Sequence, residues 1–188
     1  MISRTWATAT LLAAALAAPL GAAAQKVRLG TSEGDIVLQL DHDKAPKTVD
    51  NFIAYVKSGH YNGTVFHRVI DGFMIQGGGF DKDMKEKKTG APIALENRGG
   101  LRNERGTVAM ARTSDPNSAT AQFFINLGNN AFLDPANAPD GNGYAVFGKV
   151  VEGMAVVDRI KGMPTTTKGP HQNVPATPVL IRQATLEP

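Results

Sequence analysis

From residue 64 onward, Gly, Asn and Asp divide the chain into short apolar or alternating runs. The runs span residues 64–69, 73–76, 93–95, 107–111, 122–126, 145–151 and 179–186. Runs of this kind are typical of β-strands, because an amphipathic helix shows a longer repeat of three and four residues. Many short strands in one domain predict a sandwich or a closed barrel. The 20 Gly and 11 Pro follow no fixed period, which favours a turn-rich β protein over a helical bundle.

The segment before residue 64 adds a hairpin and a helix to this pattern. Residues 27–31 and 36–40 are rich in β-forming residues and are separated by a short turn cluster that contains Gly. An amphipathic helix is predicted to begin at Pro46 and to end at Gly59, because its apolar side chains recur three and four positions apart.

A second helix is predicted over residues 154–160, where apolar side chains again lie along one side. Residues 80–104 are interpreted as a long loop with little regular structure. No internal repeat or linker interrupts residues 25–188, so we expect them to form one domain.

The first 24 residues differ in composition from the rest. Arg4 is their only charged residue, residues 11–20 are rich in Ala and Leu, and small residues precede Gln25. This pattern predicts a secretory signal peptide over residues 1–24, because the apolar run is too short for a membrane span of about 20 residues. If the signal is bacterial, we expect the mature chain in the periplasm, with secretion to the medium as the alternative. We expect no membrane anchor, and the chain has no Cys for lipid attachment.

Charge and residue content exclude several classes of function. The 20 Lys and Arg against 17 Asp and Glu give a net charge of +3, too small and scattered for a nucleic-acid surface. The 4 His fall at no metal-ligand spacing, so no metal site is expected. The sequence lacks a phosphate-loop motif, a Gly-x-Ser-x-Gly elbow and any Cys nucleophile. These observations favour a binding protein or a reaction that needs no nucleophile.

Residues 66–78 are unusual, because they place Arg68 and Gln76 among bulky apolar side chains. By composition alone, this stretch suits a strand pair whose apolar side chains fill a core while Arg68 faces solvent. Four further sequence blocks help to interpret this stretch. They lie at residues 108–113, 118–126, 130–134 and 144–150. Residues 66–78 and these blocks, in this order, resemble the cyclophilin family of peptidyl-prolyl cis-trans isomerases. The resemblance covers essentially all of residues 25–188.

The resemblance implies a mainly β fold: a closed eight-stranded antiparallel β-barrel capped by two α-helices, with a substrate groove on the outside of the barrel. It also implies roles for side chains. Arg68 and Gln76 are the implied catalytic pair: Arg68 reaches the prolyl nitrogen and carbonyl in the transition state, and Gln76 hydrogen-bonds the substrate backbone. The residues implied to bind substrate are Phe73, Met74, Ala111, Arg112, Phe124, Phe132, Leu133 and Tyr144. No cofactor is implied, because no group or electron is transferred.

Three positions depart from the best-known eukaryotic pattern and resemble the bacterial exported branch. Phe132 stands where that pattern has Trp, Tyr144 where it has His, and Arg112 where it has Asn. The Trp helps to bind the drug cyclosporin A, and Phe has no N–H donor to replace it. We therefore expect weakened cyclosporin A binding with isomerase activity retained.

The expected function is acceleration of Xaa-Pro isomerisation during the folding of exported proteins. The expected partners are proline-containing unfolded or extended polypeptides, and the chain is expected to be a monomer. One alternative is a peptide-binding periplasmic chaperone whose turnover is incidental; the presence of both Arg68 and Gln76 favours the enzyme. A secreted factor that acts on a host or partner protein would use the same chemistry.

Overall fold

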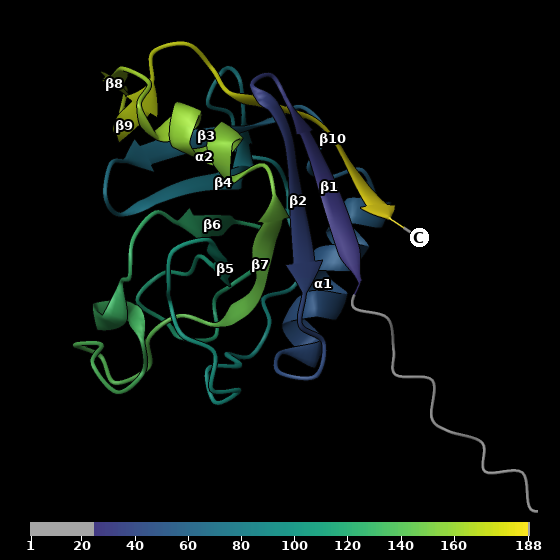
Figure 1. Ribbon diagram of the computed structural model, residues 1–188, viewed down its shortest axis with the longest axis vertical. Helices are drawn as coiled ribbons and strands as arrows, with labels where there is room; N and C mark the ends of the chain where they lie inside the picture. Colours follow the sequence, from purple (N-terminus) through teal and green to yellow (C-terminus); the bar gives the residue numbers. More distant parts are fainter. Residues whose placement is uncertain (1–24, 188) are drawn as a thin grey trace, which may run out of the picture.

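The computed structural model describes residues 25–187, in which eight antiparallel strands form a closed barrel (Figure 1). Around the barrel the order is β1-β10-β3-β4-β6-β5-β7-β2. The strands are β1 (Lys26–Thr31), β2 (Gly34–Leu40), β3 (Thr64–Ile70), β4 (Met74–Asp81), β5 (Thr107–Met110), β6 (Phe123–Asn126), β7 (Val146–Glu152) and β10 (Leu180–Glu187). The predicted eight-stranded barrel is confirmed.

Two α-helices of the described chain close the barrel near its opposite ends, α1 (Pro46–Lys57) and α2 (Met154–Lys161) (Figure 1). Pro46 suits the first turn of α1, because that position needs no N–H donor. The helix ends before Gly59, whose φ of 72° favours glycine. Phe52 on α1 and Val157 on α2 are fully buried. The apolar faces of both helices therefore complete the barrel core.

The barrel interior is filled by alternate side chains of its strands. Phe52 lies between the rings of Tyr61 and Phe147, with ring centroids 5.0 Å away in each case, and Phe123 meets it edge-on at 5.5 Å. Because successive strand residues point to opposite faces, the inward positions belong to this core and the outward ones are free for other roles. The interior is thus packed with side chains.

The structure corrects the prediction in two places. The strand predicted at residues 93–95 is wrong: Ile93 forms only an isolated bridge with Ala119. A two-stranded sheet of β8 (Thr165–Lys168) and β9 (His171–Pro175) was not predicted, because Thr165–Thr167 are polar and exposed and show no alternation. Residues 82–104 contain no named strand or helix, in agreement with the predicted loop, although β4 continues to Asp81. The predicted signal peptide, residues 1–24, lies outside the described residues.

A 3₁₀ helix, η1 (Ala131–Leu133), follows β6. No helix within residues 25–187 is long and apolar enough to cross a membrane.

Candidate active site

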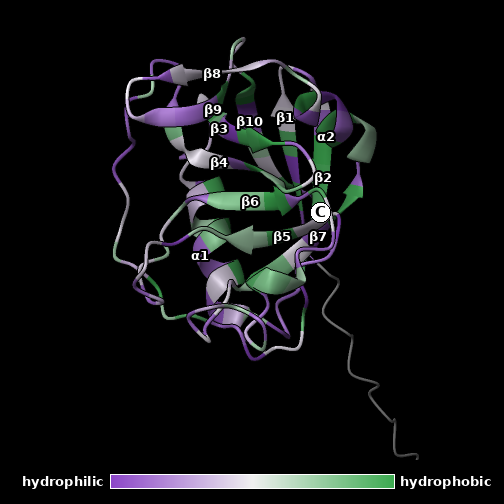
Figure 2. Cartoon of the chain, turned by 90° about the vertical axis from the view of Figure 1, so that its left-hand side faces the viewer, coloured by the Kyte–Doolittle hydropathy of each residue, from purple (hydrophilic) through white to green (hydrophobic). Residues whose placement is uncertain are grey.

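The outer face of β3, β4 and β6 brings three predicted site residues together. Gln76 on β4 pairs with Arg68 on β3 and with Phe124 on β6, so the three lie side by side on neighbouring strands. A register irregularity in β3 between Phe66 and Arg68 accompanies the change from a buried ring to an outward guanidinium. Figure 2 shows β4, β6 and β5 next to one another, with β6 and β5 coloured as hydrophobic.

An apolar cluster, separate from the barrel core, covers this outer face. Its buried members, called the outer cluster below, are Met74, Ala109, Phe124, Leu133 and Val146. Phe73, Ala111 and Tyr144 are partly buried and pack against it. The Phe124 and Tyr144 rings meet edge-on with centroids 5.7 Å apart. The structure therefore gathers six of the predicted substrate-binding residues around one apolar surface beside Arg68.

Phe132 lies at the edge of this surface. Its side chain is 53% exposed, although its ring centroid lies 5.5 Å from that of Phe73. An exposed aromatic ring beside a partly buried one offers a ligand apolar contact area. The ligand can reach this ring without displacing a side chain of the protein.

The Arg68 guanidinium keeps most of its donors free. Among the described residues its one side-chain hydrogen bond runs from Nη1 to Gln76 Oε1 at 3.4 Å, close to the limit of such bonds. Its Cζ lies 6.0 Å from the centroid of the Phe73 ring. A guanidinium carries five N–H donors, so Arg68 can donate to a molecule bound over the outer cluster.

Arg112, also a predicted substrate-binding residue, uses its side chain within the protein. That side chain is 4% exposed; Nε and Nη2 donate to the Gly143 carbonyl at 2.9 and 2.8 Å, and Nη2 pairs with Asp140. Its Cζ lies 4.5 Å from the Tyr144 ring centroid. The Arg112 guanidinium thus holds the segment that carries Tyr144.

The pKa of Asp140 is lowered to about 2, first by the backbone N–H groups of Asn142 and Gly143 and then by Arg112. The carboxylate is therefore charged at any pH near neutral. Sequence reasoning did not single out Asp140, because it lies in a Gly- and Asn-rich turn outside the family-like blocks.

Gln122 is a second residue that sequence reasoning missed. Its Oε1 accepts a hydrogen bond from Gln76 Nε2 at 2.9 Å, and its carbonyl accepts from the Ala111 N–H at 2.9 Å. The sequence did contain a signal: Gln122 precedes Phe124 by two residues, so strand alternation predicts that both side chains share one face.

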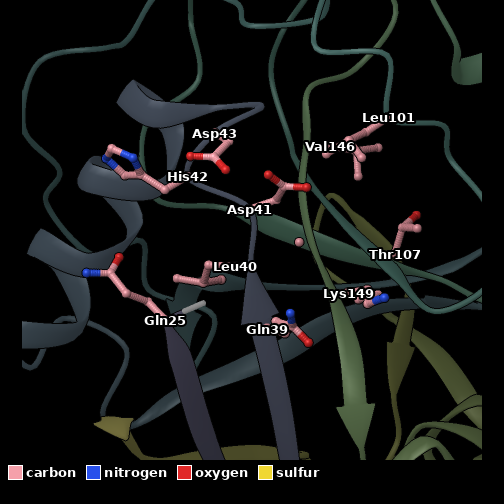
Figure 3. A pocket seen from close by; sticks show the side chains of 11 residues that line it. Gln25, Gln39, Leu40, Asp41, His42, Asp43, Leu101, Thr107, Val146 and Lys149 are labelled. Atoms are coloured by element: carbon pink, nitrogen blue, oxygen red, sulfur yellow. The ribbon is translucent and has the colours of Figure 1, made fainter. Parts of the chain in front are cut away.

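A hollow of about 500 Å³ lies on the neighbouring side of the barrel (Figure 3). Figure 3 shows Leu40 at the end of β2 and Asp41 directly after it, which line the hollow together with Val146 and Lys149 of β7. Its lining includes Leu101 and Val146, which also contact the outer cluster, but none of the predicted site residues. Among residues 25–187, no group of three or more His, Cys, Asp or Glu is placed to hold a metal ion.

Comparison with known proteins identifies the family of this chain. The family model for the cyclophilin type peptidyl-prolyl cis-trans isomerases matches residues 26–186. The chain is 62% identical over 159 residues to peptidyl-prolyl cis-trans isomerase cyp18 of Streptomyces antibioticus, covering 84% of this chain and 96% of that one. It is 55% identical over 161 residues to peptidyl-prolyl cis-trans isomerase B of Escherichia coli, covering 85% of this chain and 98% of that one.

A solved structure shows the same fold. It is a cyclophilin type peptidyl-prolyl cis-trans isomerase of Cryptosporidium parvum, crystallised in the presence of the dipeptide Ala-Pro. The TM-score is 0.72 at 28% identity, and the match covers 87% of this chain and 99% of that one. The closed barrel, the 62% identity to a curated relative and the match over residues 26–186 lead to one conclusion: this chain belongs to the cyclophilin-type peptidyl-prolyl cis-trans isomerases.

Proposed function

We propose that the outer face of β3, β4 and β6 is the active site of this isomerase, with Arg68 as its catalytic residue. We further propose that the enzyme acts in the periplasm on proline-containing chains of exported proteins while they fold. The observation that carries the first proposal is the position of a largely unpaired guanidinium beside the outer cluster.

The reaction breaks no covalent bond. Rotation about a peptide bond costs about 18–20 kcal/mol, because it destroys the amide resonance, and uncatalysed prolyl isomerisation takes about 10–100 s. In the twisted state the prolyl nitrogen becomes pyramidal and gains a lone pair that accepts a hydrogen bond. A catalyst must bind this twisted state more tightly than the planar one.

Arg68 suits this requirement, because a guanidinium is permanently charged and presents a rigid fork of donors. The outer cluster, which includes Phe124, offers apolar surface for the proline ring. Phe73 and Tyr144 pack against this cluster and extend the surface. Gln76, adjacent to both Arg68 and Phe124, is placed to hold the peptide main chain. Hydrogen bonds to the twisted amide are stronger where the bound peptide excludes water.

The decisive measurement is NMR exchange between the cis and trans forms of a short Ala-Pro-Phe peptide. We expect rapid exchange with the wild-type protein and a loss of about 100-fold or more in Arg68→Ala, the scale of removing one transition-state donor. Arg182→Ala is the matched control, because Arg182 is an exposed arginine on β10, the strand that pairs with β3. Arg68→Lys keeps the positive charge but lacks the planar set of donors of a guanidinium, so its activity should be little higher than that of Arg68→Ala.

The main alternative is a peptide-binding chaperone. It predicts that a folded wild-type protein binds the peptide without accelerating exchange, and that Arg68→Ala leaves binding unchanged. That result would reject Arg68 as a catalytic residue.

The periplasmic role is supported by the composition of residues 1–24, with one charge, an Ala- and Leu-rich run and small residues before Gln25. Expression of the full chain in a Gram-negative host, followed by fractionation and mass spectrometry of the amino terminus, tests it. We expect periplasmic protein that begins at Gln25. Cytoplasmic protein that retains residues 1–24 would exclude export.

A further inference from the structure

We propose that four buried polar side chains position the wall of the proline-binding surface. Asn103, Asn126, Asn130 and Asp134, called the amide network below, are joined by hydrogen bonds and enclose η1. None of them touches the proposed substrate position; they act through Phe132 and Leu133 on η1. This inference rests on the proposed location of the active site.

Asn130 is the centre of the amide network. Its Nδ2 donates to the Phe73 carbonyl at 2.9 Å and to Asn126 Oδ1 at 2.7 Å. Its backbone N–H donates to the Asn103 carbonyl at 2.7 Å. The Asn130 side chain therefore links the turn after β3 to the end of β6, and its backbone N–H adds the segment before β5, immediately before η1 begins.

Asn103 and Asp134 fix the other end of η1. Asp134 Oδ1 accepts from the backbone N–H of Asn103 at 2.8 Å and from its Nδ2 at 3.0 Å. Asn103 Oδ1 accepts in turn from Asn126 Nδ2 at 3.2 Å. Because Asn130 precedes η1 and Asp134 follows it, the same bonded chain holds both ends of the short helix.

The burial of these groups makes the arrangement rigid. The four residues are between 0% and 9% exposed, and a buried polar group that loses its partner costs about 1–3 kcal/mol. Among the described residues the only fully buried side-chain N or O without a partner is Nδ1 of His67, so every fully buried side-chain N or O of the amide network has a partner. Any shift of η1 would break several of these bonds together.

η1 depends on such support, because it has three residues and no side-chain cap of its own. Leu133 is part of the outer cluster, and the Phe132 ring lies against Phe73. The Leu133 carbonyl also accepts from the Tyr144 N–H at 3.0 Å. The amide network therefore sets the positions of Phe132, Leu133 and Tyr144 relative to Phe73.

These residues are proposed to bind the proline ring without touching the reacting nitrogen. Loss of the amide network should weaken planar and twisted forms of the substrate alike, which raises KM and leaves kcat nearly unchanged. A misplacement of about 1 Å costs up to about 100-fold. For Asn130→Ala we expect KM to rise by about tenfold, with kcat within about twofold of wild type.

The experiment measures kcat and KM on an Ala-Pro-Phe peptide, together with NMR order parameters of the Phe132 and Leu133 amides, under conditions where each variant is folded. Asn137→Ala is the matched control, because Asn137 Nδ2 also donates to η1, at the Ala131 carbonyl (3.0 Å), but from an exposed position. We expect Asn137→Ala to match wild type, and Asn130→Ala to lower both order parameters.

Asp134 supplies a second, milder test if Asn130→Ala does not fold. Asp134→Asn keeps the oxygen that accepts from Asn103 and should retain KM within about threefold, whereas Asp134→Ala should raise it by about tenfold. Equal effects of Asn and Ala at this position would overturn the proposal. The proposal would also be overturned if Asn130→Ala folded with a normal KM and rigid η1 amides. A variant that lost activity through a lower kcat alone would overturn it as well.

Failure of the active-site proposal would look different. If Arg68→Ala were as active as wild type, the catalytic assignment would fall, while the order parameters of Phe132 and Leu133 in Asn130→Ala would still decide whether the amide network holds η1.

Discussion

The amide of Gln76 is oriented by Gln122. Gln76 Nε2 donates to Gln122 Oε1 at 2.9 Å, which turns Gln76 Oε1 toward Arg68 Nη1 at 3.4 Å. Gln122 therefore orients one member of the proposed catalytic pair, Gln76, although Gln122 itself forms no hydrogen bond with Arg68.

Removal of this contact should lower activity. In Gln122→Ala the Gln76 amide is free to rotate, and we expect kcat/KM to fall by about threefold to tenfold. Gly79→Ala is an independent route to the same effect, because a Cβ at Gly79 would lie 2.5 Å from Gln122 Cγ and displace that side chain. Isomerase kinetics check both variants, with Gln183→Ala, an exposed glutamine on β10, as the control. Unchanged kinetics in both variants would show that Gln76 needs no such support.

A change at Phe132 should restore drug binding. Phe132 is 53% exposed, so a larger ring can be accommodated there. Because Trp adds an N–H donor, Phe132→Trp should bind cyclosporin A about tenfold more tightly, the value of one hydrogen bond of about 1.4 kcal/mol, and keep its isomerase activity. Calorimetric titration measures the affinity, and Phe132→Leu should show no gain. Equal affinities of wild type and Phe132→Trp would contradict the expected role of the indole.

Arg112 should matter for binding and not for turnover. Arg112→Leu removes the contacts with Gly143, Asp140 and the Tyr144 ring, so we expect a several-fold rise in KM with kcat retained. Kinetics on a proline peptide test this, and a fall in kcat with normal KM would assign Arg112 a role in the chemistry instead.

Asp140 should stabilise the fold at neutral pH and lose this effect in strong acid. Its pKa is about 2 in the folded chain and 3.8 in the reference state, so its contribution is present above pH 3.8 and is lost as the pH falls through about 2. Urea unfolding of wild type and Asp140→Asn should therefore differ at neutral pH and converge near pH 2. A difference that disappears already between pH 7 and 5 would assign the effect to another group.

His67 should destabilise the fold in mild acid. Its burial, with help from the nearby His171 and Arg68, lowers its pKa from 6.5 to about 4. Because the unfolded chain binds the proton first, stability should fall as the pH drops from 6.5 to about 4, by about 3 kcal/mol at most.

Replacement of the titrating ring tests this assignment. His67→Phe keeps the contact with the Phe80 ring, which now lies 4.7 Å from the imidazole, and should show a shallower loss of stability toward pH 4. Denaturant unfolding at several pH values measures the loss. The control is His42→Gln, since His42 is 51% exposed; an identical pH profile in His67→Phe and wild type would exclude His67.

The sequence allowed a strand-rich fold and both helices to be predicted from local signals such as alternation, Pro46 and Gly59, whereas closure into an eight-stranded barrel was implied only by its resemblance to the cyclophilins. It misassigned residues 93–95, since an apolar triplet does not reveal whether a partner strand exists, and Ile93 finds only Ala119. It missed β8 and its partner β9, because β8 consists of polar residues and shows no alternation.

The candidate site was predicted from residues that fall inside family-like blocks. Arg68, Gln76 and Phe124 are such residues, and the barrel register makes them neighbours. The sequence could not show that the Arg112 side chain turns inward to Gly143, or that Asn103 and Asp134 meet across 31 positions. Contacts of this kind depend on how loops return to the barrel, and no local pattern encodes them.

The barrel wall is a single layer of backbone, and it separates two sets of side chains. On β4, Ile75 faces the packed interior, while Met74 and Gln76 on either side of it face the proposed site. Selection for a folded barrel and selection for a new ligand therefore fall on alternate positions of the same strand. A cyclophilin barrel can diversify its outer surface through every second residue while the intervening residues preserve the scaffold.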